Sequence, residues 1–288
     1  MGHLHIVSTP IGHLEDVTLR ALRVLREAGL VLAEDTRRTR ILLDRHGIAA
    51  RPRSLHAHNE AARVHEVLAA LDAGTDVALV SDAGTPLVSD PGARLVAAAV
   101  AAGHAVVPVP GPSAVLAALT ASGVPADTFT FLGFLPRRTL AQKKLLAAHA
   151  HLSNALVLFE SPRRVGATLA TLHAVLGDRA ACVARELTKL HEELARGTLS
   201  ELAARFRDGA RGEVTIVVGG ASEAAERSAQ AAEPGAAAPD LDERICALLG
   251  EGRSAREIAA ALAGAFGLPK REVYARVVLA SAGRRGDA

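Results

Sequence analysis

The chain has 288 residues, of which 49% are hydrophobic, and its formal net charge is only +2. This length suggests one large or two medium-sized globular domains, and the near-neutral charge does not favour a generally basic nucleic-acid-binding protein. Aromatic residues make up 2% of the chain and tryptophan is absent, which argues against a base-stacking platform such as an RNA-recognition motif carries. Any contact with nucleic acid should be local and depend on arginine.

Cysteine content and apolar patterning exclude further classes. Cys182 and Cys246 lie far apart, without a CxxC motif or a histidine cluster, so neither a disulfide framework nor a metal site is predicted. The longest apolar stretches fall well short of the roughly 20 residues that a membrane-spanning helix needs. The N-terminus also lacks a basic region followed by a hydrophobic signal core. We therefore expect a cytoplasmic protein that makes no membrane contact.

The first part of the chain has the pattern strand, loop, helix. Residues 4–8 form a β-rich run and residues 9–16 a polar loop, and the helix that follows carries leucines at every third position of its predicted buried face. These leucines are Leu19, Leu22 and Leu25. The next strand, residues 30–33, leads into a Glu-Asp-Thr triplet. Acidic and hydroxyl groups should therefore lie at the edge of the sheet where the strands end.

An arginine-rich segment comes next. Residues 37–53 contain six arginines and one acidic residue, Asp44. Such a segment is either a solvated helix face or a patch that contacts phosphates. Residues 56–60 then end a short strand and begin a helix that runs to about residue 73. Their histidines and asparagine suit helix capping as well as they suit ligand binding.

Residues 77–113 predict a βαβ unit with parallel strands. Strand 77–80 breaks into a loop, and a helix should open at Asp90-Pro91 and close at Gly103. A second strand, residues 105–109, breaks into Pro-Gly-Pro-Ser before the helical stretch 114–121. Loops that leave the carboxyl ends of parallel strands line the ligand crevice, and small residues let the backbone approach a ligand closely. We interpret both loops as the floor of a cofactor site.

The strand pattern restarts after residue 123. Strands are expected at residues 129–134, 155–159, 180–186 and 214–219, with a basic helix after the first of them. Arg163 and Arg164 stand at a helix start, where positive charge is unfavourable. They suggest either an anionic partner or an ordinary surface role.

The C-terminal part differs in composition. Residues 222–239 are Ala, Glu, Ser, Gly and Pro without periodicity and predict a flexible linker. Three short helices follow, one opened by the capping box Ser254 to Glu257 and one with Pro269 in its first turn. They resemble a helix-turn-helix, although a helical cap or a dimer contact fits equally well.

The predicted fold class is α/β, with a parallel-sheet N-terminal domain, a smaller mixed-sheet second domain and a small C-terminal helical module. The expected boundaries are residues 1–123, 124–221, the linker 222–239 and the tail 240–288. No GxxxxGK[ST], GxGxxG or GxSxG motif is present at the required positions. The residues alone therefore indicate two α/β domains with a cofactor crevice built from small residues.

Eight segments, however, resemble the signature segments of the small-subunit ribosomal RNA methyltransferase I family, a branch of the tetrapyrrole-methylase-like enzymes. They are STPIGHLEDVTLRAL, AEDTRRTRILLDRHGI, HAHNE, VALVSDAGTPLVSDPG, VPVPGPSAVLAALTASG, FTFLGFLPRR, FESPRR and ARELTKLHEE, spread over residues 4–220. The resemblance implies a two-domain fold with S-adenosyl-L-methionine between the domains. It also implies a homodimer that methylates the ribose 2′-oxygen of a cytidine in the decoding region of 16S rRNA, within the small ribosomal subunit.

The resemblance also implies positions for the cofactor. Its loops fall on Thr-Pro-Ile-Gly near residue 10, on Gly-Thr-Pro near residue 84 and on Gly-Pro-Ser-Ala near residue 112, with weaker contacts from the second domain. Thr85 stands where many relatives have aspartate, which questions the role of its side chain. The implied cofactor-binding residues are Pro10, Ile11, Ala83, Gly84, Thr85, Val88, Ser113, Ala114, Phe159, Leu187 and Val214.

Methyl transfer to a ribose hydroxyl needs an in-line approach in a dry cleft and a base that receives the proton. The candidate bases are carboxylates at strand ends, Asp35 and Glu160, with His58 behind them. The candidate contacts to RNA are Arg37, Arg38, His58, Asn59, Arg163 and Arg164.

Two other functions stay open. A small-molecule methyltransferase of the same fold could act on a tetrapyrrole, but it would not need the arginines of residues 37–53. A non-enzymatic regulator could bind DNA with its tail and sense a metabolite in its cleft, but residues 270–274 are weakly basic for a recognition helix.

Overall fold

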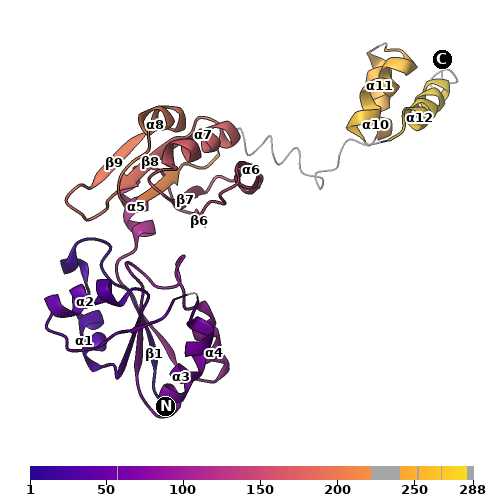
Figure 1. The fold of residues 1–288 in the computed structure, drawn as a ribbon. Helices are drawn as coiled ribbons and strands as arrows, with labels where there is room; N and C mark the ends of the chain where they lie inside the picture. Colours follow the sequence, from indigo (N-terminus) through magenta and orange to yellow (C-terminus); the bar gives the residue numbers. More distant parts are fainter. Residues whose placement is uncertain (57, 222–240, 252, 267, 284–288) are drawn as a thin grey trace. The chain divides into compact units, whose positions relative to one another are not determined.

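The computed structural model of the chain describes residues 1–56, 58–221, 241–251, 253–266 and 268–283 (Figure 1). The chain falls into two units, Met1–Ser222 and Glu223–Ala288. The first unit holds two separate five-stranded sheets, and the second holds helices. The linker expected at residues 222–239 lies outside the described residues. Among the described residues, no helix is long and apolar enough to cross a membrane.

The first sheet is entirely parallel, as the βαβ pattern predicts, with the strand order β3-β2-β4-β1-β5. Helices cover both of its faces (Figure 1), and its central strands, LVLA at residues 30–33 and VALV at residues 77–80, are continuous apolar runs rather than alternating ones. The strands are β1 (Leu4–Val7), β2 (Leu30–Ala33), β3 (Arg53–Ser54), β4 (Val77–Val80) and β5 (Val106–Val109). The helices are α1 (Leu19–Glu27) and α2 (Thr36–Arg45) on one face, and α3 (Glu60–Asp72) and α4 (Ala93–Ala101) on the other, with the short 3-10 helix η1 (Leu14–Asp16) before α1.

The buried face of α1 differs from the expected one. Leu19 is 87% exposed, whereas Ala21, Val24 and Leu25 are buried. Positions three apart step back by about 60° around a helix, so Leu19 and Leu25 lie about 120° apart and cannot both face the sheet centre. Thr18 caps the helix by accepting from the Ala21 N–H.

The start of α4 also corrects the sequence interpretation. The helix begins after Gly92, which has a φ of 121°, and not at Asp90-Pro91. Its N-terminal acceptor comes from another helix, because Glu60 Oε1 accepts from the backbone N–H groups of Arg94 (2.8 Å) and Leu95 (3.2 Å). Glu60 is 7% exposed. A buried carboxylate of α3 thus fixes the helix that follows the pocket loop.

The second sheet is mixed, as expected, with the order β6-β7-β10-β8-β9. Only the β6 and β7 pair is parallel. The strands are β6 (Phe129–Phe134), β7 (Ala155–Glu160), β8 (Ala180–Arg185), β9 (Glu193–Thr198) and β10 (Val214–Val218). The helices α6 (Thr139–Ala147), α7 (Val165–Leu176) and α8 (Leu199–Arg205) supply one apolar core.

Helix α5 (Ala114–Ser122) covers the other face of the second sheet. It lies within the residues assigned above to the first domain, but its buried Val115, Ala118 and Leu119 pack with strand residues such as Val157 and Val217. Arg196 of β9 also donates to the Ser122 carbonyl at the end of α5 (3.0 Å). The helix therefore physically joins the first sheet's last strand to the second sheet.

The second unit is a small helical bundle. It contains α10 (Leu241–Gly250), α11 (Ala255–Ala265) and α12 (Lys270–Gly283) around one apolar core. The predicted capping box is confirmed, because Ser254 accepts from the Glu257 N–H while Glu257 accepts from the Ser254 N–H. Three helices in this tail match the sequence pattern.

Candidate active site

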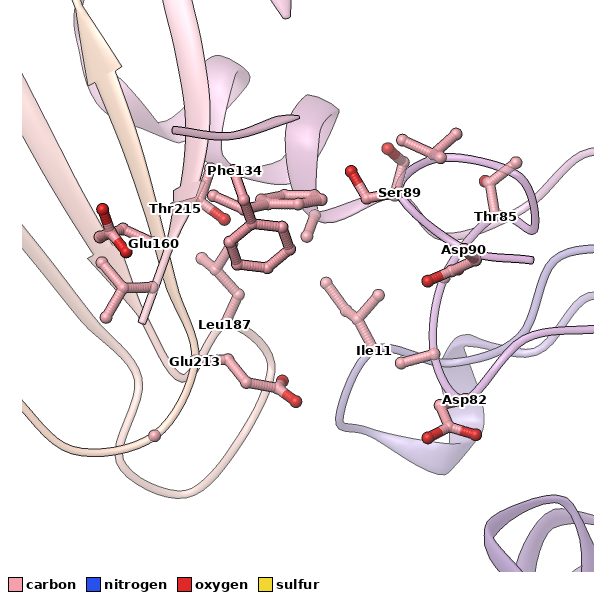
Figure 2. A pocket seen from close by; sticks show the side chains of 18 of the residues that line it. Ile11, Asp82, Thr85, Ser89, Asp90, Phe134, Glu160, Leu187, Glu213 and Thr215 are labelled. Carbon is pink, nitrogen blue, oxygen red and sulfur yellow. The ribbon is translucent and has the colours of Figure 1, made fainter. Parts of the chain in front are cut away.

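A cavity of about 430 Å³ opens between the two sheets of the first unit. Its size falls in the range of small-molecule sites. One wall comes from loops at the carboxyl ends of the first sheet's strands and the other from the second sheet (Figure 2). Such strand ends are where parallel α/β sheets bind ligands.

The loop after β4 forms the centre of the first wall. Gly84 has a φ of +75° and pairs with Thr9 through two backbone hydrogen bonds of 2.9 Å. Thr85 Oγ1 lies 3.0 Å from Ser8 Oγ and donates to the Pro112 carbonyl (3.1 Å). The Thr85 side chain therefore ties together the loops after β1, β4 and β5, which gives it a structural role.

The same loop contains backbone strain. Leu87 (φ 73°) and Ser89 (φ 71°) are non-glycine residues in the left-handed region. Such conformations cost of order 1–3 kcal/mol each and persist where the surrounding structure enforces them, often at functional sites. Val88 and Ser89 line the cavity.

Helix α5 contributes the start of its first turn to the pocket. Ser113 and Ala114 line the cavity, and Ser113 makes no side-chain cap hydrogen bond. The first N–H groups of a helix have no partner within the helix and attract negative or oxygen-bearing groups. The pocket therefore offers main-chain donors at this point.

The second wall is mainly apolar. Phe134, Leu187 and Thr215 line it (Figure 2). Phe159 and Val214 line the same wall. The loop that carries Leu187 has two residues of positive φ, Glu186 and Thr188. Lys189 pairs with Glu186 (2.7 Å), and the His13 N–H donates to Thr188 Oγ1 (3.0 Å). The two walls are thus joined directly at this loop.

Three carboxylates form an acidic group on the first wall, at Glu34, Asp82 and Asp90. Burial raises the pKa of Glu34, and the nearby charges of Asp82 and Asp90 raise it further. Burial also raises the pKa of Asp90. Sequence reasoning did not select these residues as site residues, although Glu34 and Asp82 lie just beyond strand ends and Asp90 lies shortly before α4.

The two candidate bases have different surroundings. Glu160 lines the cavity, but Oε2 accepts from the Thr168 hydroxyl (2.6 Å) and Oε1 from the Ser161 N–H (2.7 Å). Asp35 does not line the cavity; it caps α2 and binds Arg37 through both oxygens. The Arg37 hydrogen bonds lower the pKa of Asp35 to about 2.

Of the candidate RNA contacts, only Arg38 lines the cavity, where its Nε lies 3.6 Å from Asp82 Oδ2. Arg163 is exposed outside it, and Arg164 donates to the Pro136 carbonyl (3.1 Å). His58 is exposed outside the cavity.

The Asn59 side chain forms hydrogen bonds within its own loop. Its Oδ1 accepts from the His56 N–H (2.8 Å) and its Nδ2 donates to the Ser54 carbonyl (3.1 Å). It makes no side-chain cap hydrogen bond to α3.

Ten of the eleven residues implied as cofactor contacts line the one cavity, and only Pro10 does not. They are Ile11, Ala83, Gly84, Thr85, Val88, Ser113, Ala114, Phe159, Leu187 and Val214. These residues come from distant parts of the sequence and from both sheets.

A separate group of possible metal ligands lies near the amino ends of β1 and β4. Within the described part of the chain, His3, His5 and Asp76 bring one ligand atom each to within 4.8 Å of one another. The His3 ring lies 3.0 Å from Asp76 Oδ1, so a hydrogen bond already accounts for the contact. These three residues therefore lie at the opposite end of the first sheet from the loops that line the cavity.

Comparisons with known proteins agree with this architecture. The family model of Tetrapyrrole (Corrin/Porphyrin) Methylases matches residues 3–203. A ribosomal RNA small subunit methyltransferase I of Micromonospora olivasterospora is 49% identical over 282 residues, covering 97% of this chain and 88% of that protein. A protein of the same name from Thermotoga maritima is 46% identical over 221 residues, covering 76% of this chain and 99% of that protein.

A solved structure shares the fold. The uroporphyrin-III C-methyltransferase of Thermus thermophilus, complexed with S-adenyl homocysteine, superposes with a TM-score of 0.54 at 22% identity, covering 76% of this chain and 97% of that one. Identity this low supports the fold alone. The fold, the family match and the near full-length relatives together show that the chain belongs to the tetrapyrrole (corrin/porphyrin) methylases, on the branch whose members are named ribosomal RNA small subunit methyltransferase I.

Proposed function

We propose that the protein transfers a methyl group from S-adenosyl-L-methionine to the 2′-oxygen of a cytidine in the decoding region of 16S rRNA. The observation that carries this proposal is the gathering of ten implied cofactor residues in one cavity between the sheets. The names of relatives that match nearly the whole chain support the choice of small-subunit rRNA over a tetrapyrrole.

The cavity fits the cofactor in three ways. A Cβ added to Gly84 would stand 3.3 Å from Ile11 Cγ2, so the glycine keeps this cradle open. The start of α5 offers main-chain donors to polar groups, and Phe159, Leu187 and Val214 supply an apolar surface. When bound, S-adenosylmethionine supplies a methyl group that its sulfonium has already activated.

The chain's own residues would position the ribose and receive its proton. Both oxygens of Glu160 and of Asp35 already accept hydrogen bonds, and the low pKa of Asp35 makes it a weak base. Glu34 suits the role better, because it lines the cavity and burial brings its pKa closer to neutral. We propose Glu34 as the general base.

The partners follow from the same proposal. The substrate is the small ribosomal subunit or its rRNA, which implies a cytoplasmic protein. Arg38 at the cavity would contact phosphate, and Arg37 and Arg163 would extend that contact outside it. The homodimer stays a proposal, as does an RNA-binding role for the helical tail.

A deletion strain provides the test. Nucleosides of its 16S rRNA, analysed by mass spectrometry, should lack one 2′-O-methylcytidine, and expression of the wild-type gene should restore it. An unchanged content of 2′-O-methylcytidine, or a change in tetrapyrrole methylation alone, would contradict the proposal.

A further inference from the structure

Aromatic side chains are scarce in this chain, and two of them, Phe134 and Phe159, line the cavity. All six phenylalanines lie in the described residues, and three of them, Phe131, Phe134 and Phe159, form one cluster. The rings of Phe134 and Phe159 have centroids 5.6 Å apart with a tilt of 57°. Phe134 lines the cavity and is nevertheless 57% exposed. A large apolar ring is therefore held at the mouth of the cavity, with much of its surface uncovered.

A β-bulge places this ring on the cavity side of the sheet. Phe131 pairs with Val157 and Phe134 with Phe159, so β6 uses one residue more than β7 over the same distance. Side chains alternate between the two faces of a strand, and one extra residue reverses the alternation. Without the bulge, Phe134 would share the face of Leu132, which packs into the opposite core. The irregularity thus turns Phe134 towards the cavity.

The backbone on both sides of the cavity mouth adapts to this arrangement. Gly133, the bulge residue before Phe134, has a φ of +63°. Ser89 Oγ of the opposite wall lies 3.4 Å from the place that a Cβ on Gly133 would take. Ser89 itself has a positive φ. Figure 2 shows Phe134 facing the wall that carries Ser89 and Asp90 across the opening.

We propose that Phe134 is a substrate-binding residue that stacks on the base of the target nucleotide; this inference rests on the function proposed above. A ribose can enter the cavity only if its nucleotide is unstacked from the RNA, and proteins stabilise such bases on aromatic rings. The other aromatic residue of the lining, Phe159, is half-buried beneath Phe134. Arg38, which also lines the cavity and has a side chain 57% exposed, is available to a phosphate of the same strand.

Four variants of the full-length protein test this role. Phe134→Ala removes the ring, Phe134→Leu keeps an apolar side chain without a ring face, and Phe134→Tyr keeps the ring. Phe129→Ala is the matched control, because Phe129 is a 40% exposed phenylalanine of the same strand that does not line the cavity. Each protein is assayed for kcat/KM on purified small subunits and for S-adenosylhomocysteine affinity by calorimetry.

Base–aromatic stacking contributes about 1–3 kcal/mol, so Phe134→Ala and Phe134→Leu should lower kcat/KM for the subunit roughly 5- to 150-fold. The affinity for S-adenosylhomocysteine should stay within about twofold, and Phe134→Tyr and Phe129→Ala should behave like the wild type. Full activity of Phe134→Leu would overturn the stacking role in favour of simple packing. An equal loss of S-adenosylhomocysteine affinity would also overturn it, because the ring would then bind the cofactor's adenine. A wild-type protein that fails to methylate the subunit would instead refute the proposed function.

Discussion

Gly84 lines the cavity in the loop that we propose binds the cofactor. Its φ of +75° suits glycine, and a Cβ there would contact Ile11. Gly84→Val should therefore lower S-adenosylmethionine affinity more than tenfold. Gly103→Val is the control, since Gly103 has a similar φ of +80° but open space around it. Both variants should lose about 1–2 kcal/mol of stability through backbone strain. Calorimetry on the folded variants measures their S-adenosylmethionine affinity. Equal affinity in both variants would show that this loop is not part of the cofactor site.

Glu34 gives a pH-dependent prediction. Its pKa is raised above the ordinary 4.5, so its stabilising contribution is complete below pH 4.5 and is lost as pH rises through the folded-state pKa. Gln cannot ionise, so Glu34→Gln should raise the free energy of unfolding at pH 7.5 relative to the wild type, and the gain should shrink towards pH 4. Urea denaturation at both pH values measures the difference. If Glu34→Gln raises the free energy of unfolding equally at both pH values, ionisation of Glu34 does not destabilise the folded protein.

At the scale of elements, the link from α3 to α4 carries a prediction. Glu60→Ala leaves two backbone N–H groups at the start of α4 without their acceptor and should destabilise the first unit by about 1–3 kcal/mol. Glu60→Gln keeps an acceptor oxygen and loses only the charge facing the helix dipole, about 0.3–1 kcal/mol. Denaturant titration of both variants tests whether Glu60→Ala is the less stable of the two. An Ala variant no less stable than the Gln variant would show that Glu60 is not the functional cap.

The same elements show what the sequence can predict. Continuous apolar runs predicted β2 and β4 to the residue, and the turn and capping residues located α11. Strand β9 and helix α8 escaped prediction. The β9 sequence ELARGT lacks both strong alternation and a run of β-branched residues, and the strand is held in place by its pairing with β8. The true cap of α4 lies 34 residues away in sequence, and local capping rules cannot find such an acceptor. The side of the sheet taken by Phe134 likewise depends on a bulge that only the pairing with β7 reveals.

At the scale of the whole molecule, the two units have separate cores. The Thermotoga maritima relative is spanned almost completely by an alignment of 221 residues, about the length of the first unit. We therefore predict that truncation after Gly220 leaves S-adenosylmethionine affinity unchanged and permits methyl transfer at saturating substrate. RNA affinity should fall, and its dependence on salt should become shallower if the tail contacts phosphates. If the full-length and truncated proteins bind RNA with the same affinity and the same salt dependence, the tail has only a structural role.

The central claim is methyl transfer to one ribose of small-subunit rRNA by the cavity between the two sheets. Its most direct measurement is incubation of the purified protein with unmodified small subunits and methyl-labelled S-adenosylmethionine, followed by nuclease mapping and nucleoside mass spectrometry. We predict one label per subunit, recovered as 2′-O-methylcytidine from the decoding region and lost with Gly84→Val. Label on a base, label spread over many nucleotides, or no transfer by protein that binds S-adenosylmethionine would contradict the account.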